Sequence, residues 1–351
     1  MAADDAQNVT RDQPRRAVPT LEEVAALAGV SRSTASRAIN GGARVSAAAQ
    51  AAVDAAIVEL SYTPNRAARS LVTRRTDSIA LVIPEPDERV LTDPFFSATL
   101  NGLSSALAGT DLQLVLIIAR PGESDRTRRY LRNGHVDGAV VVSHHEADKL
   151  DTLLADSRLP AVFVGRPLNE VGRLNYVDVD NYEGGRLAAE HLVSTGRTRI
   201  GMIAGPQDMA AGRDRLRGWR DTLEKHGVAT DAVETSLFTT PSGAEAMHRL
   251  LDKHPDIDGV IAASDLIAVG AFNVMRERGK NVPQDIALIG FDNLGVSTSP
   301  ALTTLTNPVV AMARTAGHLL LDLLEDDEVP PQHKQFRPDL VVRATTTPAR
   351  S

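Results

Sequence analysis

The sequence predicts an α/β protein with a small helical head and a larger, two-lobed, doubly wound body. Three observations lead to this fold class. Residues 20–40 read as two short capped helices separated by a Gly-Val break. From residue 77 onward, apolar runs alternate with helical segments, which is typical of parallel sheets covered by helices. The head is basic, whereas the rest of the chain is acidic.

The first two helices are predicted from their capping residues. Thr20 and Glu23 form a capping box, in which each side chain satisfies a free backbone N–H group. Gly29 supplies the left-handed backbone that ends the helix, and Ser31 caps a second helix over 32–39. Two helices joined by so short a turn predict a helix-turn-helix, whose second helix fits the major groove of DNA. An ordinary helical hairpin is the commoner meaning of this pattern taken alone.

A third helix and a conditional fourth follow. Residues 47–60 carry apolar side chains on one face and complete a small three-helix domain. Residues 65–71 have room for about two helical turns, and a helix that short needs a partner in order to form. Arg66 and Arg69, followed by the apolar Leu71, favour the minor groove, where an apolar wedge unstacks a base step. A plain basic linker is an equally consistent interpretation.

Charge separates the head from the body. Between Arg11 and Thr76, ten arginines stand against five acidic residues, a net charge of +5, whereas the whole chain carries −7. The remainder is therefore at −12. A basic head on an acidic body favours contact with phosphates through the head.

Composition excludes several classes of protein. The chain has no cysteine, which rules out disulfides, thiol nucleophiles, iron–sulfur clusters and cysteine-bound zinc. Residues 1–19 contain no apolar run, so we expect no secretory signal, and no stretch is long enough to cross a bilayer. These features predict a cytoplasmic, nucleoid-associated protein with a disordered N-terminal arm and no membrane partner.

The body is predicted as repeated β-α units. Its apolar runs are nearly continuous, as expected of parallel strands buried on both faces. Strands are expected at 78–83, 112–118, 136–142, 160–165, 199–205, 258–263 and 285–290. Helices are expected at 96–108, 184–195, 214–226, 243–253, 266–278 and 309–325. So many strands predict two similar lobes, with a ligand cleft between them at the carboxyl ends of the strands.

Several motifs, in the right order, give the chain a specific resemblance to a known family. They are PTLEEVAALAGVSRSTASRAING (19–41), YTPNRAARSL (62–71), DPFF (93–96), VDGAVVV (136–142), VDVDNYEGGRLAAEHL (177–192), ASDLIAVGA (263–271), VPQDIALIGFDN (282–293) and LTTLTNP (302–308). On these residues the chain resembles the LacI/GalR family of bacterial transcriptional repressors along essentially its whole length. The resemblance implies a homodimer that binds a pseudo-palindromic operator, and a body like that of periplasmic sugar-binding proteins.

The resemblance also implies where the domains begin and end. The expected parts are a disordered arm (1–18), a helix-turn-helix DNA-binding domain (19–63), a hinge helix with its linker (64–76), and a two-lobed effector-binding and dimerisation domain (77–347). In the family the chain crosses between the lobes three times. The first lobe is therefore expected at 77–177 plus 308–330, and the second at 178–303 plus 336–347.

Contacts with DNA are carried over position by position. The residues concerned are Thr20, Ser31, Arg32, Ser33, Thr34, Ser36, Arg37, Asn40, Asn65, Arg66, Ala68, Arg69 and Leu71. Arg32 and Ser33 match the positions that vary with the operator, and an arginine suits bidentate contact with guanine. Contact of Arg32 with a phosphate is the alternative. Arg37 matches the strongest base reader, and Leu71 matches the minor-groove wedge, which predicts an easily unstacked CG step at the operator centre.

Contacts with an effector are carried over in the same way. The expected residues are Phe95, Phe96, Arg166, Asp180, Arg215, Ser264, Asp265 and Asp292. Arg215 matches the arginine that holds sugar hydroxyls or an acidic ligand, and Asp292 matches the acid at the cleft mouth. Ser264 stands where the family often has Asn. Phe95 and Phe96 favour a stacking platform for a sugar, although adjacent helical residues cannot share a face and a core role for one is at least as consistent.

Motifs for enzymatic chemistry are missing from the sequence. It contains no Gly-x-Ser-x-Gly, Walker loop, Gly-x-Gly-x-x-Gly or His-Glu-x-x-His. His144, His145 and Glu146 have no further residue at metal-ligand spacing and are interpreted as a solvated loop. We therefore expect a protein that is not an enzyme and holds no metal or other cofactor.

The basic head and the missing signal favour a ligand-controlled transcription factor over a periplasmic solute receptor. The segments LVTRRTDSIALVIPEP (71–86), GHVDGAVVVS (134–143), GRPL (165–168) and AGPQDMAAG (204–212) are similar to actinomycete regulators of cello-oligosaccharide utilisation. This similarity predicts a repressor of carbohydrate genes that cellobiose or a related oligosaccharide releases from DNA. A corepressor-dependent regulator, or a response to xylo-oligosaccharide or another disaccharide, is the alternative. The C-terminus has no leucine heptad, so a dimer is favoured over a coiled-coil tetramer.

Overall fold

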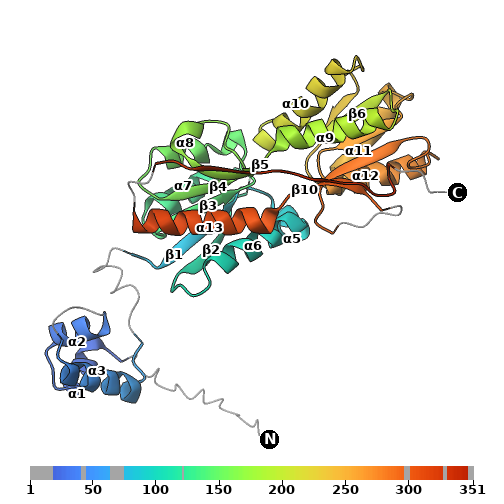
Figure 1. Cartoon of the computed structure of the whole chain (residues 1–351). Coiled ribbons are helices and arrows are strands. Elements are labelled where there is room, and N and C mark those ends of the chain that lie inside the picture. The colour runs from blue at the N-terminus through green and yellow to red at the C-terminus, as the bar shows by residue number, and fades with distance from the viewer. Residues whose placement is uncertain are drawn as a thin grey trace, which may run out of the picture. The chain divides into compact units, whose positions relative to one another are not determined.

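The computed structural model describes residues 19–40, 45–63, 75–120, 122–295, 301–326 and 330–346. The chain divides into two compact units, Met1–Thr76 and Asp77–Ser351, which we call the head and the body (Figure 1). The expected arm (1–18) and the hinge residues Asn65, Arg66, Ala68, Arg69 and Leu71 lie outside the described residues. Within the described part of the chain, every helix is too short or too polar to span a membrane.

Three helices form the head. They are α1 (Leu21–Leu27), α2 (Arg32–Ile39) and α3 (Ala47–Leu60). The predicted capping box at Thr20 is present, and Ser31 and Ser46 cap α2 and α3 through their hydroxyls. Gly29 has a φ of 66°, a left-handed conformation that glycine adopts without strain. The core of the head contains Val24, Ala25, Ala35, Ala38, Val53 and Ala56. The predicted helix-turn-helix is therefore confirmed.

The first lobe of the body is a six-stranded parallel sheet in the order β11-β5-β4-β3-β1-β2. Its strands are β1 (Ser78–Ile83), β2 (Gln113–Ile118), β3 (Gly138–Val142), β4 (Ala161–Val164), β5 (Asn175–Val179) and β11 (His333–Phe336). Its helices are α5 (Asp87–Thr92), α6 (Pro94–Ala106), α7 (Ser124–Arg132), α8 (Leu150–Ala155) and α13 (Val309–Glu325), with 3₁₀ turns η1 (Glu146–Asp148) and η2 (Val171–Arg173). The central strands β1 and β3 are buried almost throughout, as their apolar runs predict.

The second lobe repeats this plan with the strand order β12-β10-β9-β8-β6-β7. Its strands are β6 (Ile200–Ala204), β7 (Val233–Thr235), β8 (Gly259–Ala262), β9 (Ala287–Asp292), β10 (Thr303–Thr306) and β12 (Leu340–Val341). Only β12 runs antiparallel to its neighbour within the described sheet. Its helices are α9 (Asn181–Ser194), α10 (Ala210–Lys225), α11 (Thr240–Lys253) and α12 (Asp265–Glu277). Trp219, on α10, is fully buried in the core of this lobe.

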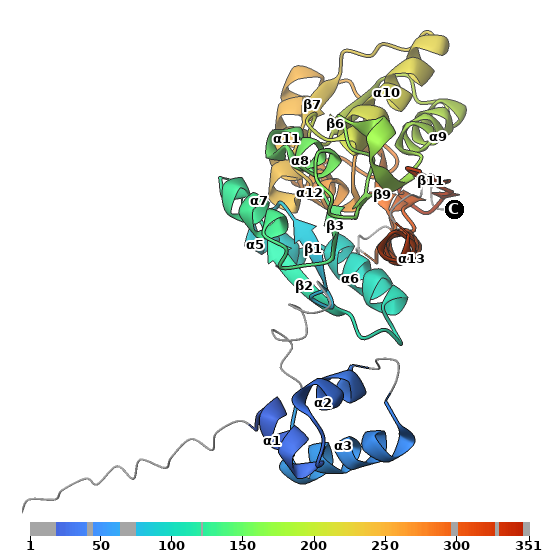
Figure 2. The ribbon, with the colours of Figure 1, turned by 90° about the vertical axis from the view of Figure 1, so that its left-hand side faces the viewer.

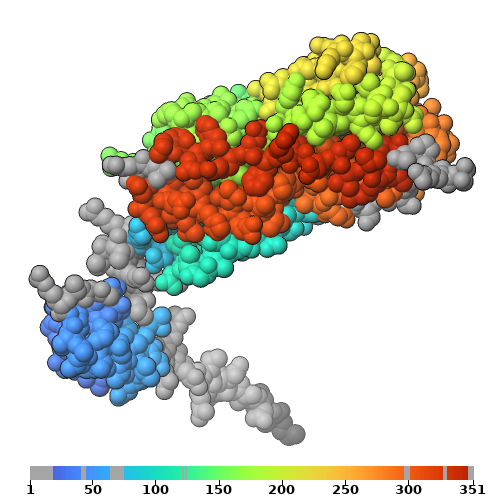
Figure 3. Space-filling view, viewed as in Figure 1, coloured from blue at the N-terminus to red at the C-terminus, as the bar shows by residue number. Residues whose placement is uncertain are grey.

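Three connections join the lobes. The chain leaves the first sheet after β5, returns to it at α13, and leaves again between β11 and β12. Figure 3 shows the C-terminal segments, in orange and red, running along both lobes. Two boundaries differ from the expected ones: Asp178 and Val179 belong to the first sheet, and the returning segment extends to Phe336. The reason is that β5 pairs with both β4 and β11.

Every strand and helix predicted for the body is present, with ends that differ by a few residues. The structure adds elements that the sequence did not predict, namely α5, α7 and α8 and the strands β5, β7, β10, β11 and β12. These elements are short, or, like α7, mostly polar and charged, so they give no clear apolar pattern. The predicted two-lobed, doubly wound architecture is confirmed.

Candidate DNA-reading helix and ligand pocket

Helix α2 has one face in the core of the head and one face in solvent. Ala35 and Ala38 are buried, whereas Arg32, Ser33 and Arg37 are exposed. The helical period of 3.6 residues places the exposed residues along one side. A short helix that offers basic and hydroxyl side chains on its free face suits the major groove of DNA.

Hydrogen bonds order the side chains of α2 at both of its ends. Ser31 Oγ lies 2.9 Å from Thr34 Oγ1 and accepts the Thr34 N–H at 3.1 Å. Arg37 Nε donates to a backbone carbonyl one turn earlier at 3.2 Å. Asn40 Nδ2 donates to the Ser36 carbonyl at 2.8 Å. These polar groups are therefore positioned by the helix itself.

Arg32 has an ion-pair partner that the sequence analysis missed. Its Nε lies 2.5 Å from Glu22 Oε1 on α1, and the two side chains are 71% and 61% exposed. An exposed pair of this kind stabilises a protein little, so Arg32 can exchange Glu22 for a base or a phosphate. Thr20 remains exposed beside α1, where Glu23 holds it in the capping box.

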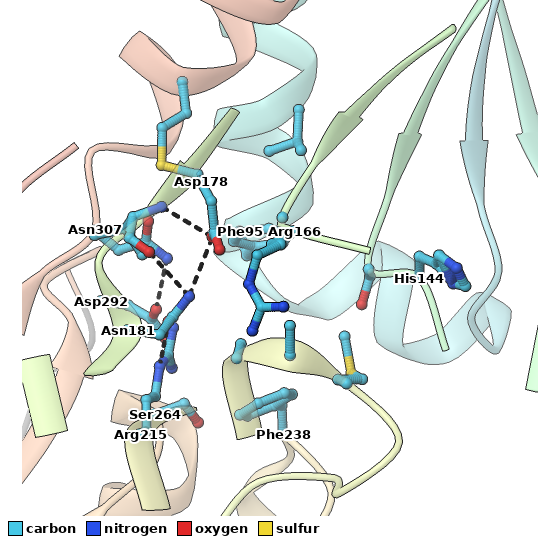
Figure 4. Close-up of a pocket in the computed structure, with 18 of the residues that line it drawn as sticks. Phe95, His144, Arg166, Asp178, Asn181, Arg215, Phe238, Ser264, Asp292 and Asn307 are labelled. Atoms are coloured by element: carbon cyan, nitrogen blue, oxygen red, sulfur yellow. Dashed lines mark hydrogen bonds between the residues drawn. The ribbon is translucent and has the colours of Figure 1, made fainter. Parts of the chain in front are cut away.

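A pocket lies between the two lobes, at the carboxyl ends of strands from both sheets (Figure 4). The first lobe lines it with Arg89, Asp93, Phe95, Ser143, His144, Val164, Gly165, Arg166, Asp178, Val179 and Met312. The rest of its lining is Asn181, Met209, Ala210, Ala211, Arg215, Phe238, Ser264, Leu266, Asp292 and Asn307. The space between these atoms is about 760 Å³, including solvent at the mouth, which lies in the range of small-molecule sites.

Arg215, on α10, is held rigidly at the wall of this pocket. Its Nε donates to Asn181 Oδ1 at 2.9 Å, and a second guanidinium N–H group donates to the Ala263 carbonyl. The guanidinium carbon lies 3.5 Å from the centre of the Phe291 ring, which adds a cation–π contact. These contacts fix both the position and the orientation of the Arg215 guanidinium.

Two carboxyl groups accompany Arg215 at one end of the pocket, the buried Asp178 and the half-buried Asp292 (Figure 4). Burial raises the pKa of Asp292 to about 7, against the opposing effect of Arg215, and burial also raises the pKa of Asp178 to about 6. Asp292 ends β9 with a φ of 125°, a strained backbone conformation of the kind found at binding sites. Asn307 Nδ2 donates to Asp292 Oδ1 at 3.0 Å.

Several buried polar atoms at the pocket have no hydrogen-bond partner within the described residues. They are Arg89 Nε, Asn307 Oδ1 and both ring nitrogens of His144. His144 Nε2 does lie 3.3 Å from Asp151 Oδ2, but not in hydrogen-bonding geometry. Burial lowers the pKa of His144 to about 4, so the imidazole is neutral at pH 7. Because buried polar groups are nearly always hydrogen-bonded, a ligand with several hydroxyl groups suits these atoms.

Most of the expected effector residues lie together in this pocket. Those that line it are Phe95, Arg166, Arg215, Ser264 and Asp292. Phe96 instead packs into the first-lobe core, because it faces away from Phe95 on α6. Asp180 instead caps α9, where it accepts a backbone N–H group at 2.9 Å. Asp265 is buried behind the wall and accepts the Thr304 hydroxyl at 2.6 Å.

The pocket lining also contains residues that were not predicted from the sequence. Asp178 and Asn181 lie in the motif VDVDNYEGG, where a change from strand to helix marks the end of a strand and hence the cleft. Arg89, on the short helix α5, and Phe238, after the short strand β7, had no such signal.

The interpretation of residues 144–146 as a solvated loop is wrong for His144 and His145, whereas the Glu146 side chain is partly exposed. The His144 side chain is only 7% exposed, and its ring lies 5.4 Å from that of Phe163. His145 contacts Glu85 and Asp208. These histidines come within three residues of the end of β3, at the carboxyl edge of the sheet, and His144 lines the pocket. In the described parts of the chain, three or more metal-binding side chains nowhere come together as a possible ligand set.

Comparisons with known proteins agree with this architecture. Residues 20–65 match the family "Bacterial regulatory proteins, lacI family", and residues 189–346 match the "Periplasmic binding protein-like domain". The HTH-type transcriptional regulator CelR of Thermobifida fusca is 44% identical, over 94% of this chain and 98% of its own.

Two solved structures are similar over nearly the whole chain. A complex of the transcriptional regulator CelR with cellobiose is 41% identical, with a TM-score of 0.74, and covers 93% of this chain and 99% of its own. The lac repressor dimer bound to operator and the anti-inducer ONPF is 26% identical, with a TM-score of 0.80 and the same coverage.

The family assignment therefore rests on both units of the chain. The head has the helix-turn-helix, the body has the two lobes and their pocket, and one relative matches both with 44% identity. The family consists of transcriptional regulators and not of enzymes. This chain belongs to the LacI family of bacterial regulatory proteins and is a transcriptional regulator.

Proposed function

We propose that this chain is a repressor of carbohydrate-utilisation genes that a sugar releases from its operator. A homodimer binds pseudo-palindromic double-stranded DNA through its heads, and an oligosaccharide, cellobiose first, occupies the pocket of each body. The observation that carries this proposal is the pocket between the lobes, because a ligand bound there contacts both lobes at once. Such a ligand favours one arrangement of the lobes over another and so shifts the affinity for DNA.

The chemistry of the pocket supports an uncharged, polyhydroxyl ligand. Its lining contains three arginines and three aspartates, namely Arg89, Arg166, Arg215, Asp93, Asp178 and Asp292. A strongly anionic ligand would face these carboxylates, and an apolar ligand would leave many polar groups without partners. Phe95 and Phe238 add apolar faces against which a sugar ring can pack.

Cellobiose is the first candidate because a similar structure is described as a complex of CelR with cellobiose. The candidate pocket residues are Phe95, Arg166, Arg215, Ser264 and Asp292, to which the structure adds Arg89, Asp178, Asn181, Phe238 and Asn307. A xylo-oligosaccharide or another disaccharide is the alternative, since the same polar groups serve many hydroxyl patterns.

In the proposed complex with DNA, α2 is the reading helix. Arg32 and Ser33 select the bases, and Thr34, Ser36, Arg37 and Asn40 dock the helix against bases and phosphates. The exposure of Arg32, Ser33 and Arg37 supports these roles. Contacts with phosphates release counterions, so we expect operator affinity to fall steeply as the salt concentration rises.

Exposed leucines on the first lobe support dimerisation. Leu91, Leu100 and Leu116 are 80%, 41% and 47% exposed. Leu116 belongs to β2, the edge strand of its sheet. Figures 1 and 2 show this strand beside α6. An uncovered apolar edge is a hazard in a monomer, and a second copy of the chain would cover it.

Fluorescence anisotropy with an operator selected from random DNA tests the proposal. The full chain should bind, a chain lacking residues 1–75 should not, and cellobiose should lower operator affinity in a panel of sugars. A sugar that raised operator affinity would make the protein a corepressor-dependent regulator. If no sugar in the panel changed operator affinity, the proposal would be wrong.

A further inference from the structure

Glu85 lies at the carboxyl end of the first-lobe strand β1 and is almost completely buried. It does not line the pocket, yet it holds two side chains that do. Its carboxylate accepts a hydrogen bond from Ser143 Oγ at 2.6 Å and pairs with the Arg89 guanidinium. Arg89 leaves its Nε without a partner in the described residues. Glu85 thus fixes the direction from which Arg89 meets a ligand.

Arg89 in turn touches both lobes. Its guanidinium carbon lies 5.4 Å from the ring centre of Phe96 in the first lobe and 5.3 Å from that of Phe238 in the second. Cation–π contacts of this kind are strongest when the cation is shielded from water, as Arg89 is. The position of Arg89 therefore depends on how the lobes meet.

A second route leads from Glu85 directly across the cleft. His145 Nε2 lies 3.1 Å from Glu85 Oε1, and His145 Nδ1 lies 2.9 Å from Asp208 Oδ2. Asp208 belongs to the second lobe, in the loop between β6 and α10, and does not line the pocket. The Asp208 carbonyl also accepts the Glu146 N–H at 2.9 Å. We call Glu85, His145 and Asp208 the interlobe latch.

The charges of the latch are mutually favourable. Burial lowers the pKa of His145, but the hydrogen bond to Glu85 and the charges of Glu85 and Asp208 outweigh it and raise the pKa to about 9. Burial raises the pKa of Glu85, but His145 and Arg89 outweigh this effect and lower it. At pH 7 a protonated His145 therefore bridges Glu85 of the first lobe and Asp208 of the second, and charge-assisted hydrogen bonds are strong.

We propose that Glu85 is a positioning residue of the pocket and that the interlobe latch couples ligand binding to the arrangement of the lobes. A ligand that engages Arg89 and Ser143 stabilises their bonds to Glu85, which hold His145 against Asp208. Conversely, a closed latch presents Arg89 and Ser143 to the ligand. This inference rests on the proposed function and adds the residues through which the pocket senses closure.

The latch predicts that replacing Asp208, which lies outside the pocket, weakens ligand binding. Isothermal titration of the full chain with cellobiose, without DNA, measures this effect in Glu85→Gln, His145→Gln and Asp208→Asn. We expect dissociation constants about tenfold higher for the first two variants and about threefold higher for Asp208→Asn. The effect of Asp208→Asn is smaller because the Asp208 side chain is more exposed than those of Glu85 and His145.

Glu234→Gln is the matched control. Glu234 is a nearly buried carboxylate of the second lobe that pairs with two cations, Arg249 and Lys253. Neither cation belongs to the latch. Its replacement should leave cellobiose affinity within about twofold of the wild type. Wild-type affinity in Asp208→Asn and His145→Gln, or an equal loss in Glu234→Gln, would overturn the latch.

A second measurement decides the question without a ligand. The effects of His145→Gln and Asp208→Asn on the free energy of unfolding in urea should not be additive in the double variant, because the residues are partners. Additive effects would overturn the latch even if cellobiose binds. If the wild-type chain bound no sugar while the cycle showed coupling, the proposed effector would be wrong and the latch would stand.

Discussion

Arg215 and Arg32 show how differently two arginines can be prepared for binding. Arg215 is buried and held by Asn181, Ala263 and Phe291, so it is oriented before a ligand arrives. Arg32 is exposed, and its one ion-pair partner among the described residues is a surface carboxylate, that of Glu22. Salt and water screen such a pair. The first arrangement suits a fixed recognition group, and the second suits a side chain that adapts to different operators.

Replacing Arg215 tests the rigid arrangement. Arg215→Lys keeps the charge but loses the planar fork that bonds Asn181 and Ala263, so we expect sugar affinity to fall about 100-fold. Arg217→Lys is the control, because Arg217 lies on the same helix but is mostly exposed. Titration calorimetry with cellobiose measures both, and unchanged affinity in Arg215→Lys would remove Arg215 from the site.

Replacing Glu22 tests the adaptable arrangement. Glu22→Gln frees Arg32 and removes a negative charge near the DNA, so operator affinity should rise about threefold at low salt. Glu59→Gln makes the same change of charge on α3 and should have a smaller effect. Anisotropy titrations at two salt concentrations compare them, and equal effects would show that only net charge matters.

Asp292 makes stability depend on pH in a defined direction. Burial raises its pKa in the folded protein to about 7 from an ordinary value of 3.8. The stability it contributes is therefore present at acid pH and is lost as pH rises through about 7. Calorimetry between about pH 5.5 and 8.5 should show a smaller fall of the melting temperature in Asp292→Asn than in the wild type. An identical fall would contradict this assignment.

At the scale of elements, the close packing of α9 against α10 positions Arg215. Gly185 of α9 lies against the backbone of α10, so that a Cβ atom there would come within 2.2 Å of the Arg215 carbonyl oxygen. Gly218 of α10 lies equally close to the Tyr182 carbonyl, at 2.1 Å. Glycines on both helices thus allow them to approach closely and bring Arg215 to the pocket wall.

The close packing of α9 against α10 predicts that a substitution there lowers both the stability of the body and its affinity for sugar. Gly185→Ala should destabilise the body by about 3 kcal/mol and weaken sugar binding, because the helices must move apart. Gly172→Ala is the control, since a Cβ atom there meets nothing within 4 Å and its backbone needs no positive φ. Urea unfolding and sugar titration measure both variants, and wild-type behaviour of Gly185→Ala would contradict the packing argument.

At the scale of the whole molecule, the body joins two sheets by three connections and encloses the pocket between them. Segments distant in the sequence, such as β5 and β11, pair in one sheet. This connectivity lets a ligand between the lobes act on both of them. The first sheet ends in the partly exposed, apolar edge strand β2, on which the proposed dimer rests.

The edge strand predicts the effect of disrupting a dimer. Leu116→Asp places a charge on the apolar edge of β2, so we expect monomers in analytical ultracentrifugation and at least about tenfold weaker operator binding. Val342→Asp is the control, because Val342 is similarly exposed but lies outside this strand. A dimer that survived Leu116→Asp would place the interface elsewhere.

The sequence by itself determined the local elements of this protein and its family. Capping residues, apolar runs and the division of charge depend on near neighbours along the chain, and the helix-turn-helix and the central strands followed from them. The resemblance to the family also predicted Arg215 and Asp292 as effector residues, and both line the pocket.

Only the tertiary structure decided which distant groups meet. His145 and Asp208 are 63 positions apart and belong to different lobes, so no local pattern could pair them. The choice between Phe95 and Phe96, and the displacement of Asp180 and Asp265 from the pocket, depended on which way each helix faces. The physical reason is that periodicity in the sequence indicates single helices and strands, whereas a binding site forms where several of them end. The order of the strands and the packing of the helices decide which ends come together.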